Sequence, residues 1–308
     1  MAAWAEGRID ARAFDDDVHR ARAAFARIVG VQADDVACGN AVSVFAGLVA
    51  ASVPAGGEIL VAAGDFTSVM YPMLVQESRG VRVREVPLEQ IANAIDARTS
   101  LVAVSAVQSA DGRVADLHAL ADAASDHGAD VFLDATQAAG WLPIDATRFA
   151  FVCAGAYKWL LSPRGTALMS VRPQAAQRVA AHTAGWYAAA DPWSCCYGGP
   201  LRLSATAKRF DVSPAWTCWA GTRASLELID ELGVDAIGAY DLALAARLRE
   251  GLGMAPSDSA IVIVDVPDAE QRLREAGIRA SVRAGRVRLS CHLPATVDDV
   301  DRAVAALS

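Results

Sequence analysis

Short apolar segments alternate with amphipathic helical patterns along most of the chain. A short apolar run between turn residues is typical of a buried strand, and apolar residues at three- and four-residue spacing are typical of a helix. Strands and helices in alternation indicate a mostly parallel sheet with helices on both faces. We predict strands at 58–62, 81–86, 101–105, 131–134, 151–154 and 166–171, with helices at 17–29, 40–52 and 117–127 among them.

The pattern changes in the last quarter of the chain. Two long helices are predicted at 215–232 and 234–252, after an irregular connection at 201–214. Because a single core stops growing near ~250–300 residues, a chain of 308 residues has room for a second, smaller core. We therefore expect a large α/β domain over 1–233 and a small α+β domain over 234–308, with strands at 260–266, 280–283 and 286–290 and helices at 268–276 and 297–307.

The amino-acid composition and net charge argue against several classes of binding partner. The chain is 54% hydrophobic and 21% charged, as expected of a packed globular protein, and its net charge of −8 repels nucleic-acid phosphates and anionic membrane surfaces. The longest apolar stretch, 41–53, is shorter than the ~20 residues that span a bilayer. The start of the chain has no secretory apolar region, and the six cysteines show no metal spacing. We expect a cytoplasmic protein without a metal site, nucleic acid or membrane as partner.

Two polar residues follow neighbouring predicted strands. Asp134 ends one apolar segment, and Lys158 follows the next. Ligands of open α/β sheets bind beyond the carboxyl ends of the strands, so both side chains are predicted to lie where a ligand binds. Taken singly, each has an ordinary explanation, because an aspartate after a strand is commonly a helix cap and a lysine is commonly a solvated surface amine.

A turn of small residues opens the predicted helix at 40–52. Backbone N–H groups at such a helix start, together with the helix dipole, favour an anion such as phosphate. A plain helix start is the alternative explanation. The residues that would form this phosphate cradle are Gly39, Asn40, Ala41 and Val42.

The segments around Asp134 and Lys158 resemble the class V aminotransferase family of enzymes that use pyridoxal 5′-phosphate (PLP). The resemblance is carried by DATQ at 134–137 and YKWLLSPRG at 157–165, and it extends over nearly the whole chain. It implies the PLP-dependent transferase type I fold, PLP bound as an imine on Lys158, and Asp134 paired with the pyridine nitrogen. A carboxylate there keeps the nitrogen protonated, so that the ring withdraws electrons from the substrate.

The same resemblance implies further contacts. Gln137 would hydrogen-bond the phenolic oxygen or the imine region of PLP, and Phe66 would stack on the pyridine face. Gln108 would lie near a cofactor oxygen or the substrate, with an ordinary loop amide as the alternative explanation. Two aromatic residues, Tyr157 and Trp186, resemble phosphate contacts of the kynureninase branch, with core packing as the alternative explanation.

Substrate recognition and assembly are implied in the same way. Arg288 resembles the arginine of the family that binds the substrate carboxylate, and a guanidinium suits a carboxylate because it binds in a bidentate manner and stays charged. The substrate is then an amino acid or a related amine. The family builds each site at a two-fold interface, which implies a homodimer.

The reaction is left open among several outcomes. Lys158, once released, would remove a proton from the substrate carbon, after which transamination, epimerisation or lyase chemistry can follow. Transamination is our main expectation. A cysteine desulfurase would carry a catalytic cysteine ahead of the carboxylate arginine, but residues 253–287 contain none, and Cys291 lies beyond Arg288.

The beginning of the chain adds a non-catalytic alternative. Members of the family usually have an extended segment ahead of the first helix, and we expect this segment to be missing here. A PLP-fold protein that acts only as a binding module is therefore a competing hypothesis. The presence of Asp134, Gln137 and Lys158 together argues against it, because a site that has lost its chemistry has no need of the lysine.

Overall fold

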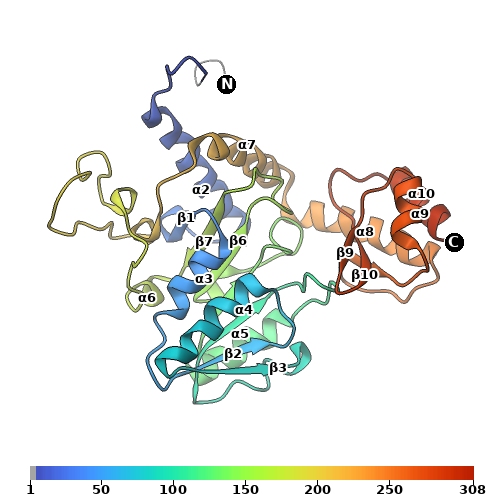
Figure 1. The fold of residues 1–308 in the computed structure, drawn as a ribbon, viewed down its shortest axis with the longest axis horizontal. Coiled ribbons are helices and arrows are strands. Elements are labelled where there is room, and N and C mark those ends of the chain that lie inside the picture. The colour runs from blue at the N-terminus through green and yellow to red at the C-terminus, as the bar shows by residue number, and fades with distance from the viewer. Residues whose placement is uncertain (1–4) are drawn as a thin grey trace.

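The computed structural model describes residues 5–308, which form a large lobe around one sheet and a smaller C-terminal lobe (Figure 1). The large sheet has seven strands in the order β1-β7-β6-β5-β4-β2-β3. Strands β3, β2, β4, β5 and β6 pair in parallel, while β7 is antiparallel to both β6 and β1. The strand bounds are β1 (Val36–Gly39), β2 (Glu58–Ala62), β3 (Arg82–Val86), β4 (Thr99–Ser105), β5 (Asp130–Asp134), β6 (Phe151–Gly155) and β7 (Ala167–Val171).

Helices cover both faces of this sheet. On β2, Leu60 and Ala62 join the core that contains α2 (Asp15–Val29), α5 (Leu117–His127) and α7 (Trp216–Leu232). The alternate residues Ile59 and Val61 join the core that contains α3 (Val42–Ala50) and α4 (Thr67–Leu74). Burial on both faces explains why these strands appear in the sequence as continuous apolar runs. The predicted α/β fold with a mostly parallel central sheet is confirmed.

The small lobe has its own sheet and core. Its three antiparallel strands lie in the order β8-β10-β9, over Ile261–Val264, Arg286–Ser290 and Ser281–Arg283, and pack against α9 (Ala269–Glu275) and α10 (Val297–Leu307). Helix α8 (Val234–Gly251) extends from the large lobe to the small one (Figure 1). Its Ile237 belongs to a core of the large lobe, while Leu244 and Leu248 belong to the core of the small lobe.

The remaining elements are short. Most of them connect the strands and helices of the large lobe. They are α6 (Pro173–Ala176) and the 3-10 helices η1 (Ala11–Phe14), η2 (Ala33–Asp35), η3 (Val75–Arg79), η4 (Leu88–Gln90), η5 (Ala146–Arg148), η6 (Trp186–Ala188) and η7 (Ala207–Phe210). Within residues 5–308, none of the helices combines the length and the apolar character needed to cross a membrane.

Strand β1, which the sequence pattern did not reveal, is fixed by a buried ion pair. Asp211 accepts the backbone N–H of Cys38 at 2.7 Å, and Arg22 of α2 pairs with the Asp211 carboxylate at 2.5 Å. Both charged side chains are almost fully buried. The pair therefore joins α2, β1 and the segment after η7, and it fixes the strand that leads into the predicted phosphate cradle.

Gly238 provides a test of how closely the start of α8 packs against the large lobe. A Cβ atom at Gly238 would lie 2.3 Å from the backbone oxygen of Trp141, whereas a Cβ atom at Gly47 in α3 would have no neighbour within 4 Å. We expect Gly238→Ala to lower the free energy of unfolding by about 2 kcal/mol through overpacking. Gly47→Ala, the same change in another helix, is expected to raise it by up to about 1 kcal/mol. Urea denaturation measures both, and equal effects would contradict the packing described here.

Candidate active site

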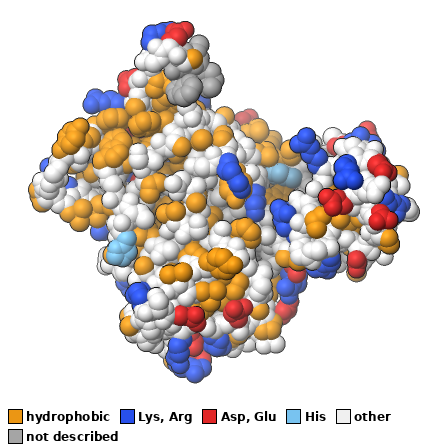
Figure 2. All heavy atoms as spheres, in the orientation of Figure 1, with side chains coloured by type: hydrophobic (Ala, Val, Ile, Leu, Met, Phe, Trp, Pro, Cys, Tyr) orange, Lys and Arg blue, Asp and Glu red, His pale blue; other side chains and the backbone are white. Residues whose placement is uncertain are grey.

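The carboxyl edge of the large sheet brings several predicted residues together. Asp134 is the last residue of β5 and lies in register between Ser105 of β4 and Cys153 of β6. Lys158 lies in the turn that follows β6. A cavity of about 540 Å³ lies between the lobes; the large lobe contributes Gln137, Lys158 and Trp159 to its wall, and the small lobe contributes Arg288, Ser290 and His292. Figure 2 shows basic side chains on both sides of the hollow between the lobes.

Asp134 is a buried carboxylate whose charge is only partly compensated. Burial raises its pKa to about 6; the hydrogen bonds from Thr136 and the charge of Lys158 lower it, and the nearby Asp65 carboxylate raises it. The backbone N–H of Thr136 donates to Asp134 at 2.9 Å. A cation placed against Asp134 would favour the charged carboxylate, since an opposite charge at close range lowers the pKa of an acid.

Lys158 is a partly desolvated amine. Burial lowers its pKa to about 8; the Asp134 charge opposes this shift, and Arg288, Arg283 and Arg164 add to it. A large fraction of the amine is therefore neutral near pH 8, and a neutral amine is the form that attacks a carbonyl carbon. The Lys158 Nζ atom also lies 5.4 Å from the centre of the Phe66 ring, so the structure places the predicted stacking residue beside the predicted attachment point.

Phe66 is held in place by a neighbour that the sequence reasoning missed. Asp65 is buried and accepts hydrogen bonds from the Ser105 backbone N–H at 2.7 Å, from the Ser105 hydroxyl at 2.6 Å and from the Phe66 N–H at 2.6 Å. These bonds tie the segment after β2 to the end of β4. The signal in the sequence was the acidic residue directly before Phe66, but a contact with Ser105 is visible only in the folded chain.

Gln137 lines the cavity and has a buried side-chain donor without a partner in the described part of the chain. Its side-chain oxygen accepts the Trp159 indole N–H at 2.8 Å, and its backbone oxygen accepts the Trp141 indole N–H at 2.7 Å. The side-chain nitrogen of Gln137 is buried and has no partner among residues 5–308. An unpartnered buried donor costs free energy, and an acceptor bound in the cavity removes that cost.

The predicted phosphate cradle lies at the end of β1 and the start of α3. Ala41 is the N-cap of α3 and has no side-chain oxygen to cap the first turn, and that turn contains no acidic residue. Its N–H groups and the helix dipole therefore suit an anion. Gly39 has a packing role as well, because a Cβ atom there would lie 2.6 Å from the Phe45 ring. Asn40 lies between the strand and the cap.

Tyr157 lies beside this cradle. A Cβ atom at Gly155 would approach the Tyr157 ring at 3.1 Å, and the side chains of Val42 and Thr136 at 3.5 Å each, so the four residues meet at the end of β6. Thr136, which the sequence reasoning did not select, accepts the Gly155 N–H at 2.9 Å through its hydroxyl. It thus joins the turn that carries Asp134 to the turn that carries Tyr157 and Lys158.

Gln108 and Arg288 meet through a loop that follows β4. Gln108 is buried, and its side-chain nitrogen is 3.4 Å from the Ser105 oxygen. Arg288 comes from β10, donates to the backbone oxygen of Ser109, and has its Nε atom buried without a partner among the described residues. Burial, followed by repulsion from Arg283, lowers the pKa of Arg288 below its usual range. This arrangement suits an anionic partner.

Trp186 is the one predicted residue that the structure leaves apart from this group. It lies in η6 and packs against Trp193 and Tyr187, at ring-centroid distances of 5.0 and 5.3 Å. It lines a separate hollow together with Cys195 and Cys196. None of the described contacts joins Trp186 to Lys158 or Asp134.

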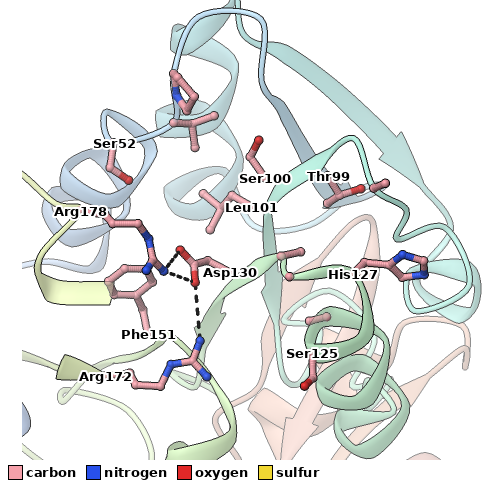
Figure 3. A pocket seen from close by; sticks show the side chains of 16 residues that line it. Ser52, Thr99, Ser100, Leu101, Ser125, His127, Asp130, Phe151, Arg172 and Arg178 are labelled. Carbon is pink, nitrogen blue, oxygen red and sulfur yellow. Dashed lines mark hydrogen bonds and ion pairs between the residues drawn. The ribbon is translucent and has the colours of Figure 1, made fainter. Parts of the chain in front are cut away.

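A second pocket lies at the opposite, amino edge of the sheet (Figure 3). The Nη2 atom of Arg178 donates to both carboxylate oxygens of Asp130, at 2.6 and 2.7 Å, and Arg172 approaches the same carboxylate at 3.7 Å. One carboxylate thus compensates much of the positive charge there. The length of the strands separates this pocket from the predicted site residues. The cavity beside Lys158 is therefore the better candidate for an active site.

The residues at the carboxyl edge of the large sheet fit PLP. Three features would each meet a different part of that molecule: a buried carboxylate of raised pKa, an unpartnered amide donor and an uncapped helix start. The pyridine nitrogen, the phenolic oxygen and the phosphate are the matching groups. The amine of Lys158 lines the adjoining interlobe cavity and is available for the aldehyde.

Comparison with known proteins agrees with this chemistry. The family model for class V aminotransferases matches residues 10–275. The uncharacterized aminotransferase YcbU of Bacillus subtilis is 27% identical over 92% of this chain and 81% of its own length, and isopenicillin N epimerase of Streptomyces clavuligerus is 24% identical over 94% and 83%. The solved structure of the cystine C-S lyase C-DES shares the fold, with a TM-score of 0.85 at 21% identity over 96% of this chain and 87% of that one. Another C-DES structure carries glycine covalently linked to PLP.

The raised pKa of Asp134 predicts that the cofactor-free protein becomes less stable as the pH rises. Because its pKa rises from 3.8 in the unfolded chain to about 6 in the fold, the stability it contributes is present below pH 4 and is lost as the pH passes through 6. We expect the stability of Asp134→Asn relative to the parent protein to increase by about 3 kcal/mol between pH 4 and pH 7. Urea denaturation of the cofactor-free proteins measures this.

Asp130→Asn is the matched control for that experiment. It makes the same substitution at the other end of β5, where the carboxylate is ion-paired with Arg178 and partly exposed. No gain in stability is expected for this variant above pH 6. A difference between Asp134→Asn and the parent that does not change with pH would contradict the assigned burial of Asp134.

Proposed function

Because the chain belongs to the class V aminotransferase family of PLP-dependent enzymes, we propose that it is an aminotransferase that moves the amino group of an amino acid to a keto acid. The observation that supports this best is the meeting of Lys158, Gln137 and Arg288 on one cavity, with the buried carboxylate of Asp134 close enough to Lys158 for their charges to interact. An amine for the cofactor and a guanidinium for a carboxylate lie on opposite lobes, so a small amino acid would fit between them.

Bound PLP supplies an electron-withdrawing ring that stabilises negative charge on the substrate carbon. Asp134 would hold a proton at the ring nitrogen, and its burial strengthens that interaction because the local dielectric is low. Phe66 would fix the plane of the ring by flat contact, without adding a charge. The start of α3 would bind the phosphate together with Tyr157.

Lys158 would serve in two ways. Its amine would hold the cofactor between reactions and, once displaced by substrate, would remove and return a proton at the substrate carbon. A pKa near 8 suits both tasks, because the group is then able to accept and release a proton near neutral pH. The positive charges of Arg288 and Arg283 help to keep that pKa low.

The cysteines of the chain do not support a desulfurase that works through a protein persulfide. Cys291 is buried, and burial raises its pKa to about 12, so little reactive thiolate is present near neutral pH. Cys195 and Cys196 line the hollow near Trp186. The wall of the interlobe cavity, as far as residues 5–308 form it, contains no cysteine.

Three further expectations belong to the same proposal. We propose that residues 1–233 form a large domain that binds the cofactor and that residues 234–308 form a small C-terminal domain that contributes Arg288. We propose a homodimer in the cytoplasm, an environment that suits the free cysteines of the described chain. We also propose a role for Trp186 in contacting the phosphate.

The covalent role of Lys158 predicts a spectroscopic result. Protein mixed with PLP is expected to gain the visible absorption band of a lysine-linked cofactor, and borohydride is expected to fix the cofactor to the peptide that contains Lys158. Lys158→Ala should show neither effect, while Lys208→Ala, the loss of a lysine elsewhere in the chain, should show both. A parent protein without a visible band would refute the proposed function.

Arg288 predicts a selective change in substrate binding. Lysine keeps the charge but loses the bidentate geometry, so Arg288→Lys is expected to raise the KM for an amino acid substrate about tenfold or more. An amine without a carboxylate should react equally well with both proteins. Arg286→Lys, two residues away on an exposed position of β10, is the matched control and should leave KM unchanged.

Steady-state assays measure these KM values, and analysis of the products identifies the reaction. Keto acid formed together with a new amino acid supports the aminotransferase. A racemised amino acid or an eliminated β-substituent would instead identify an epimerase or a lyase.

A further inference from the structure

The amide of Gln137 can take only one orientation in this fold. The indole N–H of Trp159 donates to the Gln137 side-chain oxygen at 2.8 Å, and an indole nitrogen is a donor only. If the amide were reversed, two donors would face each other. The Gln137 nitrogen is therefore directed away from Trp159, as the free donor of a residue that lines the cavity.

Trp159 in turn is held by the small lobe. The ring of His292, which follows β10, packs on the Trp159 indole with centroids 4.6 Å apart and an interplanar angle of 52°. His292 is held by Asp241 of α8, since its Nδ1 atom lies 3.3 Å from the Asp241 carboxylate. Asp241 is fully buried, and this contact is its described side-chain hydrogen bond.

We propose that His292 and Asp241 are positioning residues that act on the cofactor through Trp159 and Gln137. By fixing the indole of Trp159, they fix the direction in which Gln137 donates its hydrogen bond, and the phenolic oxygen of PLP is the acceptor that this donor would meet. This inference rests on the proposed function, because it requires PLP in the interlobe cavity. The position of the small lobe would then affect how firmly Gln137 binds the cofactor.

The surroundings of Gln137 provide an internal control. Trp141 also packs against Trp159, with centroids 5.5 Å apart, and its indole N–H also donates to Gln137. The acceptor in that case is the backbone oxygen, whose direction is fixed by the chain. Loss of the Trp141 donor therefore leaves the side-chain amide oriented, whereas loss of the Trp159 donor frees it to rotate.

The test compares PLP-loaded variants by their absorption spectra and by the rate at which PLP dissociates on dilution. Trp159→Phe keeps an aromatic ring but removes the donor, and we expect PLP to leave about tenfold faster, as for the loss of one well-directed hydrogen bond to a charged oxygen. The visible band should also change in position or relative height. Trp141→Phe, an equally large change in the same cluster, should keep the parent rate and band.

Two variants test the contribution of the small lobe. His292→Asn removes the ring from Trp159 but still offers Asp241 a hydrogen-bond donor, which favours a folded protein. His292→Phe keeps a ring against Trp159. We expect the asparagine variant to change the band and the dissociation rate in the direction of Trp159→Phe, and the phenylalanine variant to lie closer to the parent protein.

The outcomes separate the two proposals. A parent protein that binds no PLP overturns the proposed function. A parent protein with a normal band, together with unchanged behaviour in Trp159→Phe or the same change in Trp141→Phe, overturns the role of the amide. A change in Trp159→Phe without one in His292→Asn overturns the role of the small lobe. Near-ultraviolet circular dichroism of each variant confirms that the comparison is made on folded protein.

Discussion

The burial of the Asp134 carboxylate is the constraint around which the site is arranged. A carboxylate removed from water is costly unless a cation or several donors compensate it. Here the fold supplies the backbone and side-chain donors of Thr136 and the nearby charge of Lys158, while Asp65 adds a second negative charge in the same region. The carboxyl edge of the sheet is therefore short of positive charge in front of Asp134, and a protonated ring nitrogen would restore the balance. The family to which the chain belongs uses a cofactor with this property.

A second buried carboxylate shows the contrasting case. Asp211 is as deeply buried as Asp134, but it is paired with Arg22 and accepts the N–H of Cys38. Although burial disfavours the charge of Arg22, the Asp211 carboxylate raises its pKa well above the usual range. Burial still raises the pKa of Asp211 itself, but a guanidinium and a backbone donor within the chain are paired with it, and so this aspartate joins elements of the fold. Asp134, by contrast, lies at the edge of the sheet where a ligand is predicted to bind.

The sequence predicted the parts of the fold that depend on local pattern. The parallel strands, the long helices α2, α7 and α8, and the small lobe all carry strong apolar periodicity. Strand β1 was missed because its four residues, VACG, are small and short and are extended mainly through pairing with β7 and the contact with Asp211. Helix α4 was missed because it is short and contains Pro72.

The candidate site likewise contains residues that a local motif reveals and residues that only long-range contacts reveal. Asp134, Gln137 and Lys158 are recognisable because they stand in two short motifs that are close together in the sequence. The residues that orient them were not predictable, since Asp65 reaches Ser105 across 40 positions and His292 lies more than 130 positions from Trp159 in the sequence. The first of these contacts follows from the pairing of strands in the large sheet, and the second from the docking of one lobe on the other. The residue types alone do not show which distant side chain contacts a site residue.

The loop between β4 and α5 has a consequence for how this protein can change over evolution. Its backbone is paired with itself, from Gln108 N–H to the Arg113 oxygen and from Ala115 N–H to the Ala106 oxygen. It also holds Arg288 through the Ser109 oxygen, and Gly112 lies so close to Ile261 of the small lobe that a Cβ atom would approach it at 2.8 Å. An insertion or deletion here would shift both Arg288 and a contact between the lobes. Relatives with new substrates should therefore keep the length of this loop and vary elsewhere around the cavity.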